Sequence, residues 1–381
     1  MRKVLLQAQR FIDGNRKHAK FRLVKIYSKP FGKYFQRKET FFLDNEVLLD
    51  KTRKINDLFA DQPSRFECKL CSSELKKTHD LEQHGVKYIF CDSCNHLNGM
   101  NHDTLDFVNA IYIQEGGAEY SKNYVQADFL TRASEIYRPK LEFLMSALKH
   151  DGIQAPREIL DVGSGSGHFV FESIRSGIPT RGIDVNSEMV RHGNTHIHAS
   201  LGTMPLELVN EDSFFSRISQ TEADVISAIG VIEHLRNPGE FFSAFIQSRA
   251  TYVFYSVPMF SLSVLLENVF NDVFPRQLGG GHTHLFTEKS ISHLNELFQA
   301  NPISEWRFGT DIMDMIRSLE VTLKRNGSSD KTIEIARKNL LQSADSLQSS
   351  LDKNHFCSEI HVVAKKISEG SKQVQPDNKM R

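Results

Sequence analysis

The sequence lacks an excess of either charge. Its 47 Lys and Arg residues equal its 47 Asp and Glu residues, so the overall charge does not favour a nucleic acid or an acidic membrane surface as partner. The distribution is uneven, because the segment from Met1 to Lys54 holds fifteen basic and five acidic residues. This basic arm is either a solvated helical face or a contact for an anionic surface.

Long apolar runs are also missing. No window approaches the roughly 18 consecutive apolar residues of a membrane-spanning helix, and the most apolar segment, residues 252–260, resembles a strand. The apolar stretch at the start of the chain is interrupted by Gln7, Gln9 and Arg10, so it does not resemble a secretory signal. We therefore expect a soluble, cytoplasmic protein.

Cysteine is scarce, and four of the five cysteines form two Cys-x-x-Cys pairs. In a reducing compartment such pairs indicate a metal site rather than a disulfide framework. Nineteen residues separate the pairs, and four thiolates complete the tetrahedral shell of Zn²⁺. We predict a structural zinc ribbon with the ligands Cys68, Cys71, Cys91 and Cys94. The alternative is a redox dithiol pair; the nearby His96 and His102 are interpreted as bystanders.

From Arg157 onward, short β-rich runs alternate with amphipathic segments of helix length. This alternation indicates an α/β fold with a doubly wound, mostly parallel sheet covered by helices. We divide the chain into a mainly helical arm (1–63), the zinc ribbon (64–105), a helical connector (106–155), the α/β domain (156–367) with a helical insertion (310–352), and a disordered tail (368–381).

A glycine-rich turn follows the first predicted strand of the α/β domain. Residues 159–162 lead into Gly163-Ser164-Gly165-Ser166-Gly167 and then a helical segment. Glycine has no Cβ atom, so the amides of this turn can close on a ligand. Asp161 can accept a hydrogen bond from a cofactor amino group or anchor the turn, and Asp184, ending the next strand, can hold a ribose. The pattern alone fits either a dinucleotide or S-adenosylmethionine.

The block ILDVGSGSGHF, followed by GIDVNSEMV and AIGVIEHLRNP, resembles the successive motifs of class I S-adenosylmethionine-dependent methyltransferases. Over residues 157–366 it is most similar to the ubiquinone-biosynthesis O-methyltransferases and sugar C-methyltransferases, and the N-terminal ribbon resembles that of deoxysugar C-methyltransferases. The resemblance implies a seven-stranded sheet. In this family an acid after the third strand often contacts the adenine, and this sequence departs from the pattern because Thr203 stands where that acid is commonly seen. The resemblance also implies that S-adenosylmethionine is bound by Asp161, Gly163, Ser164, Gly165, Gly167, Asp184, Val185 and Ile229.

Glu233 and His234 follow the fourth strand, whose carboxyl end borders the ligand crevice in this architecture. The methyl group of a sulfonium is already reactive, so the protein mainly has to align the acceptor and remove its proton. We expect His234 to be the catalytic base, with Glu233 orienting it. The alternative is that this pair only fixes the loop by hydrogen bonds.

A second histidine cluster follows the glycine run 279–281. It resembles the segment after the fifth strand that commonly borders the substrate in the family, and we expect substrate contacts from His282 and His284. A metal site here is disfavoured, because the two histidines lie in a loop without nearby carboxylates. In the connector, Tyr120, Tyr124, Arg132 and Tyr137 form either a lid, with Tyr124 contacting the substrate, or ordinary packing.

The fourth strand is not followed by an Asn/Asp-Pro-Pro-aromatic motif, and no Pro-Cys nucleophile occurs, which argues against methylation of nucleobases. We therefore expect methyl transfer to an oxygen or carbon of a small acceptor, such as a sugar or nucleotide sugar of surface polysaccharide synthesis. The alternative is an RNA methyltransferase that docks rRNA or tRNA with the ribbon and the basic arm. A non-catalytic scaffold is disfavoured by the complete cofactor motif.

Overall fold

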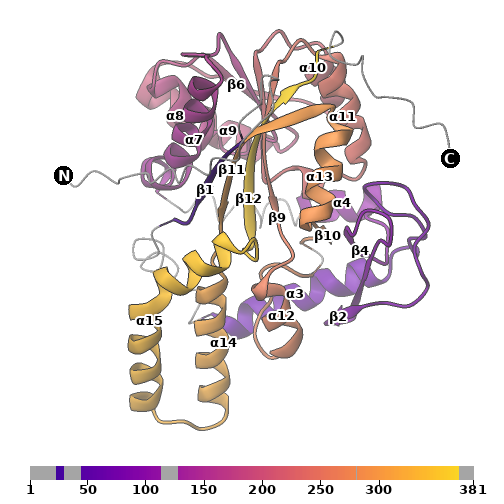
Figure 1. Cartoon of the computed structure of the whole chain (residues 1–381), viewed down its shortest axis with the longest axis vertical. Coiled ribbons are helices and arrows are strands. Elements are labelled where there is room, and N and C mark those ends of the chain that lie inside the picture. Colours follow the sequence, from indigo (N-terminus) through magenta and orange to yellow (C-terminus); the bar gives the residue numbers. More distant parts are fainter. Residues whose placement is uncertain (1–22, 30–43, 113–127, 280, 369–381) are drawn as a thin grey trace, which may run out of the picture.

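The computed structural model describes residues 23–29, 44–112, 128–279 and 281–368. Its main element is an eight-stranded sheet with the order β1-β11-β12-β9-β8-β5-β6-β7 (Figure 1). The strands are β1 (Val24–Tyr27), β5 (Ile159–Val162), β6 (Thr180–Asp184), β7 (Leu206–Leu208), β8 (Val225–Ile229), β9 (Tyr252–Pro258), β11 (Ala300–Phe308) and β12 (Glu359–Lys366). The strands from β9 to β7 are mutually parallel, and β12 runs antiparallel to both of its neighbours.

Helices cover both faces of this sheet and define the α/β domain. One face packs against α7 (Arg138–His150) and α8 (His168–Arg175), and the other packs against α10 (Glu211–Ser219), α11 (Pro238–Gln247) and α13 (Glu288–Leu297). Strands buried on both faces are nearly continuous apolar runs, and all of β9 is buried. The predicted doubly wound fold is confirmed.

The sheet has one strand more than the seven predicted. β1 comes from the basic arm and pairs parallel to β11, with Val24 opposite Ser304. Only four residues form this strand, so its alternation is too short to stand out in a sequence that otherwise suggests a mainly helical arm. The rest of the arm, residues 1–22 and 30–43, lies outside the described residues, as do residues 369–381 of the predicted disordered tail.

The strand order reverses between β5 and β8. From β5 the chain proceeds to β6 and β7 on one side, and it then returns to β8 and β9 on the other side. Ligands of doubly wound sheets bind at the carboxyl ends of the strands beside such a reversal. The glycine turn after β5 and the loop after β8 both lie there.

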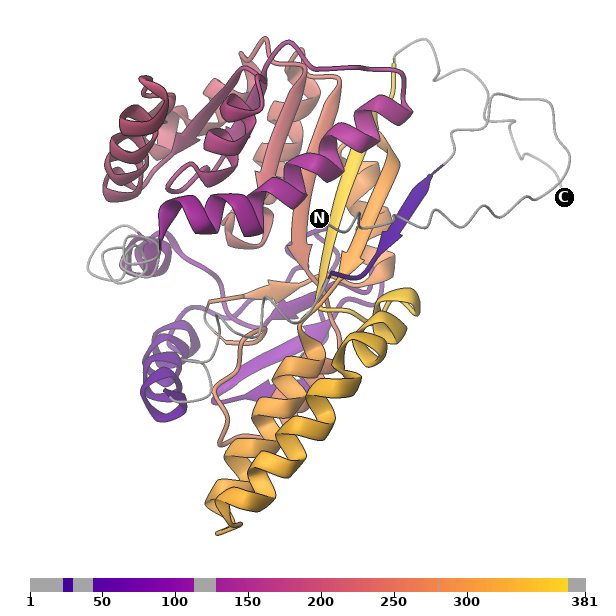
Figure 2. The same cartoon turned by 90° about the vertical axis from the view of Figure 1, so that its left-hand side faces the viewer.

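The remaining helices connect and extend this framework. They are α3 (Asn45–Ala60), α4 (Leu105–Tyr112), α6 (Phe129–Arg132), the π-helical η1 (Ala133–Tyr137), α9 (Ser187–Leu201), the 3₁₀ turn η2 (Ile232–His234), α12 (Leu262–Val269), α14 (Asp311–Arg325) and α15 (Asp330–Lys353). The last two form a hairpin that projects from the body of the molecule (Figure 2). Among the described residues, no helix has the length and apolarity to cross a membrane.

The ribbon (residues 64–105) forms a second sheet that is completed by the α/β domain. Its order is β10-β4-β3-β2, built from β2 (Leu81–Gln83), β3 (Val86–Phe90), β4 (Leu97–Gly99) and β10 (His284–Leu285). β10 belongs to the segment after β9, so the α/β domain supplies the fourth strand. Buried ribbon residues also share one hydrophobic core with β8, β9 and α11. The ribbon is therefore part of the same folded body.

Candidate active site and metal centre

The glycine turn lies between β5 and α8, and its conformation requires glycine. Gly163, Gly165 and Gly167 have φ values of +63°, +53° and +70°, in the left-handed region that L side chains disfavour. A Cβ atom on Gly163 would lie 2.7 Å from Cγ2 of Val231 in the loop after β8. The turn is therefore closely packed against the loop that carries Glu233 and His234.

Replacement of Gly163 by alanine is expected to weaken binding of S-adenosylhomocysteine about tenfold and to destabilise the fold by about 1–2 kcal/mol, because the left-handed backbone is strained and Val231 must move. Gly177→Ala is a matched control, since Gly177 has a φ of +79° and open space around its Cβ position. Gly177→Ala should lower the stability of the fold but leave the affinity for S-adenosylhomocysteine unchanged. Chemical denaturation measures the stability, and calorimetry measures the affinity. Equal affinities of the two variants would contradict the packing argument.

Asp184 ends β6 and is joined to the glycine turn. The backbone N–H of Gly165 donates to its Oδ2 at 2.7 Å, and the N–H of Asn186 donates to its Oδ1 at 2.8 Å. Burial raises the pKa of Asp184, and these amides oppose the shift. Each carboxylate oxygen accepts more than one hydrogen bond, so Asp184 retains acceptor capacity for a ribose.

Asp161 lies near the end of β5 and is buried beneath the turn. The hydroxyl of Ser227 on β8 donates to its Oδ1 at 2.6 Å. Burial raises the pKa of Asp161 to about 7, whereas the Ser227 hydrogen bond and the positive charge of Lys140 lower it. Asp161 is thus a carboxyl group that ionises near neutral pH in the absence of a bound cation.

Glu233 and His234 occupy η2, directly after β8. Oε1 of Glu233 lies 4.0 Å from Nε2 of His234, and the rings of His234 and His282 are 5.5 Å apart between centroids. Burial raises the pKa of Glu233 to about 8 and lowers the pKa of His234 to about 3, with the positive charges of His282 and Lys69 adding to the latter shift. The structure therefore brings three protonatable groups together at this edge.

The four paired cysteines of the ribbon converge on one point. Their Sγ atoms all lie within 4.8 Å of one another, with 3.6 Å between Cys68 and Cys94 and 3.5 Å between Cys71 and Cys91. These separations fit the roughly 3.8 Å expected between thiolates that bind one tetrahedral Zn²⁺ at about 2.3 Å. The four donors thus fit a single ion.

The two cysteine pairs have the same backbone geometry. The N–H of Cys68 donates to Ser73 O and the N–H of Cys91 donates to His96 O. The residue after each pair, Ser72 or Asn95, has a φ of +59°. Each pair thus forms the same tight knuckle, which aims both thiols at the common point.

Comparison with known proteins finds a family match for part of the chain. Residues 128–305 match a family model described as a methyltransferase domain. We refer to this segment, 178 of the 381 residues, as the methyltransferase domain. No curated protein matches the chain.

The solved structures that are similar to the chain include two methyltransferases. Magnesium protoporphyrin IX methyltransferase from Synechocystis, with bound S-adenosylhomocysteine, is 12% identical with a TM-score of 0.43, over 69% of this chain and 100% of that one. A methyltransferase dependent on S-adenosylmethionine from Archaeoglobus fulgidus is 16% identical with a TM-score of 0.39, over 66% of this chain and 99% of that one. Neither similarity identifies the acceptor.

Most of the residues expected to bind the cofactor lie together in the methyltransferase domain. Asp161, the glycine turn with Ser164, and Asp184 are linked by the contacts above, and Val185 and Ile229 follow or end β6 and β8 at the same edge. Thr203 does not lie there. It precedes β7, which runs parallel to β6, because Gly202 ends α9 with a φ of +71° and the strand starts only afterwards. The carboxyl end of β7 leads instead to Asn210.

His284 is not at the substrate edge, contrary to expectation. Its side chain is 1% exposed, and its Nδ1 lies 2.7 Å from Nε2 of His96 in a hydrogen bond. Pairing of β10 with β4 brings His284 to the interface with the ribbon, where it meets His96. His96 is not one of the four clustered cysteine donors. His282, two residues before His284, does lie beside His234.

The predicted lid falls partly outside the described residues, which exclude Tyr120 and Tyr124. Tyr137 stacks on His168 at 5.3 Å between ring centroids, so it packs on the first residue of α8, immediately after the glycine turn. Arg132 precedes it on the same helical segment and contributes to the electrostatic environment of both Tyr137 and His168. Tyr137 and Arg132 thus link the helical connector to the start of α8, next to the glycine turn.

Sequence reasoning missed Lys140. This residue on α7 is buried, and its charge lowers the pKa of both Asp161 and Glu233. A lysine on an amphipathic helix normally indicates a solvated face, so no local signal could have singled it out.

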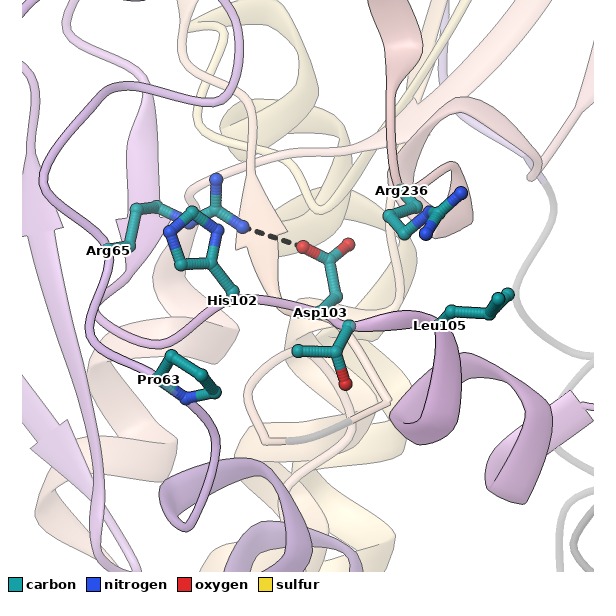
Figure 3. A pocket seen from close by; sticks show the side chains of 7 residues that line it. Pro63, Arg65, His102, Asp103, Leu105 and Arg236 are labelled. Atoms are coloured by element: carbon teal, nitrogen blue, oxygen red, sulfur yellow. Dashed lines mark hydrogen bonds and ion pairs between the residues drawn. The ribbon is translucent and has the colours of Figure 1, made fainter.

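Sequence reasoning also missed a pocket between the ribbon and the loop after β8. It has a volume of about 410 Å³. Arg65 and His102 line it on the ribbon side, and Arg236 lies across from them (Figure 3). Arg65 donates to Asp103 at 2.6 Å. The sequence offers no sign that these distant residues meet.

Proposed function

We propose that this methyltransferase domain transfers the methyl group of S-adenosylmethionine to an oxygen or carbon of a small acceptor, such as a sugar or nucleotide sugar. The pocket beside Arg236 carries this proposal. Its volume of about 410 Å³ lies within the range of about 300–1,000 Å³ that is usual for small-molecule sites. Arg236 is two residues beyond His234, so an acceptor in this pocket would lie close to the proposed catalytic residues.

The lining of the pocket favours an acceptor with an anionic group. Arg65 and Asp103 form an ion pair, which leaves Arg236 as a cation on the opposite wall (Figure 3). Guanidinium groups bind phosphate in two-pronged hydrogen bonds. A sugar linked to a nucleoside diphosphate would provide both an anionic group and a methyl acceptor, with its phosphates at Arg236 and its sugar toward His234.

In this proposal the glycine turn and two carboxylates hold the cofactor. The glycine turn would border the amino-acid part, Asp161 would accept from its ammonium group, and Asp184 would accept from the ribose hydroxyls. Bound S-adenosylmethionine supplies a methyl group on a positively charged sulfur. The absence of Cβ atoms at the three glycines supports this fit, because side chains there would occupy the cradle.

The affinity for S-adenosylmethionine should rise with pH through about 7. Asp161 has a pKa of about 7 in the free protein, and only its ionised form attracts the ammonium group. The affinity should be measured below about pH 7.5, because an α-amino group with a pKa of about 7.7–8.0 is mostly charged there. Asp161→Asn should abolish the dependence, as followed by calorimetry.

Ser227→Ala sharpens this test. The Ser227 hydrogen bond lowers the pKa of Asp161, so its loss should move the midpoint of the affinity profile to higher pH. An unchanged midpoint, or the same profile in Asp161→Asn, would contradict the assignment.

Removal of the acceptor's proton is assigned to His234, oriented by Glu233. Both side chains stand at the carboxyl end of β8, beside the glycine turn. A positioned base contributes a rate factor of about 10² to 10⁴, which suits a reaction whose methyl donor is already activated.

Structural Zn²⁺ in the ribbon is the second part of the proposal. Four thiolates with the separations given above fill a tetrahedral shell and leave no open position for a substrate. Cys68, Cys71, Cys91 and Cys94 would therefore hold an ion that stabilises the ribbon, and the ribbon in turn forms one wall of the pocket.

Turnover of methyl-labelled S-adenosylmethionine against pools of nucleotide sugars, quinone precursors and total RNA tests the acceptor class. We expect label in the nucleotide-sugar pool, with little effect of added salt. Label in RNA, with binding that weakens steeply as salt increases, would replace the small acceptor by rRNA or tRNA docked on the ribbon and the basic arm.

A further inference from the structure

Three side chains beside the proposed acceptor site have metal-binding geometry of their own. Glu233, His234 and His282 each offer one ligand atom, and these atoms all lie within 4.8 Å of one another. Ligands of one ion with bonds of about 2.1 Å are separated by about 3–4.2 Å. The distance of 4.0 Å between Glu233 Oε1 and His234 Nε2 lies near the upper end of that range, so an ion would draw these two side chains slightly closer together.

Glu233 has unused acceptor capacity in a buried place. Its side chain is 5% exposed, and its Oε2 has no hydrogen-bond partner among the described residues. Two nearby lysines are engaged elsewhere, because Lys69 pairs with Asp103 and Lys140 lies 3.8 Å from Glu359. Ionising a buried carboxyl group without a partner is costly, and a bound cation would offset that cost.

His282 is held in the orientation of a metal ligand. Its Nδ1 lies 2.9 Å from the carbonyl oxygen of Gln277. Because a carbonyl only accepts, Nδ1 carries the proton and donates, which leaves the lone pair on Nε2. Metal-binding histidines usually have this arrangement, in which the second nitrogen donates to a backbone carbonyl and fixes the ring.

We propose that Glu233, His234 and His282 bind one divalent cation, such as Mn²⁺, Fe²⁺, Co²⁺ or Zn²⁺, at the carboxyl end of β8. Two imidazoles and one carboxylate on one side of an ion leave coordination positions open on the other. Those positions suit two adjacent oxygen atoms of an acceptor. The site is distinct from the four cysteines, and the three ligands come from two separate segments of the methyltransferase domain.

The role of this cation in catalysis rests on the proposed function. A cation that binds a hydroxyl makes it more acidic, so the acceptor's proton would pass to water. The bond between methyl and sulfur then breaks, the bond between methyl and oxygen forms, and the electron pair of the broken bond remains on sulfur. His234 would hold the ion instead of taking the proton, and the acceptor would be an oxygen nucleophile with a neighbouring oxygen, such as a vicinal diol.

Titration of the full chain with Mn²⁺, followed by electron paramagnetic resonance, tests the site. The ribbon is first loaded with one Zn²⁺ per chain, because Mn²⁺ competes poorly for thiolates. We expect one additional Mn²⁺ per chain. Glu233→Gln and His282→Ala should each weaken its binding by more than about tenfold, since even loss of a ligand's supporting group costs about 10–100-fold. His198→Ala, on the exposed side of α9, is the matched control and should bind Mn²⁺ like the wild type.

Two outcomes would overturn the proposal. One is that folded, zinc-loaded protein binds no additional Mn²⁺. The other is that binding persists unchanged in both Glu233→Gln and His282→Ala.

A second readout locates the ion relative to the cofactor. Bound Mn²⁺ should broaden the NMR signal of ¹³C-methyl S-adenosylmethionine, because the glycine turn packs against the loop that carries the ligands. A sharp methyl signal with both molecules bound would contradict this location. Failure to bind S-adenosylhomocysteine in calorimetry would instead refute the proposed function, and the Mn²⁺ titration would still report on the metal site.

Discussion

Cys94→Ser is expected to abolish the zinc binding proposed for the ribbon and to lower the free energy of unfolding of the whole chain by several kcal/mol. A structural zinc site in an isolated peptide contributes about 10–16 kcal/mol of apparent binding energy, and a domain is stable by only about 5–15 kcal/mol. The melting temperature should therefore fall by on the order of 10 °C. Metal analysis and differential scanning calorimetry measure the two effects.

The loss of stability should extend to the methyltransferase domain because the ribbon and this domain pack against each other. The hydroxyl of Tyr88 on β3 accepts from the N–H of Gly279 at 2.7 Å, β10 pairs with β4, and the hydrophobic core is continuous. Cys357→Ser is the matched control, because this cysteine is also buried but lies outside the cluster. Equal zinc content and melting in the two variants would remove the ribbon's proposed role.

His234→Ala is expected to reduce turnover by about 10² to 10⁴ while S-adenosylhomocysteine binds with nearly unchanged affinity. We expect the affinity to be retained because His234 lies beyond the residue that packs on the glycine turn and is not part of the turn itself. Steady-state turnover with the acceptor found in the labelling experiment, together with calorimetry, separates the two quantities.

The same loss of turnover follows whether His234 takes the proton or holds a cation, and metal dependence distinguishes the two roles. A chelator that leaves the ribbon zinc in place should inactivate the wild type only if the cation is required. His198→Ala again serves as the control, with normal turnover. Full activity of His234→Ala would exclude both roles.

Local patterns predicted the framework of the methyltransferase domain. The apolar run before Gly163, the acid at the end of β6 and Pro238 at the start of α11 each define an element boundary by their own chemistry. The glycines at 163, 165 and 167 all have positive φ, a conformation that glycine adopts readily. Such features depend on a few neighbouring residues and can be read from sequence.

Contacts between distant segments could not be predicted in this way. The sequence disfavoured a metal at His282 and His284, because two histidines separated by one residue lack a carboxylate. The fold instead brings Glu233 and His234 to His282 from the loop after β8, and removes His284 to the ribbon interface. The sequence could not identify Lys140 and Arg236 as site residues for the same reason. Their positions at the site depend on how helices and loops from distant parts of the chain pack together.

The shared ribbon sheet also constrains how the chain reaches its native state. His96 and His284, which meet across β4 and β10, are 188 residues apart, so a ribosome must synthesise most of the protein before the last edge of this small sheet can be covered. Until then, β4 offers unpaired backbone groups to any neighbouring chain. An isolated N-terminal fragment should therefore self-associate even with its metal bound, and the ribbon cannot be transplanted as a separate module.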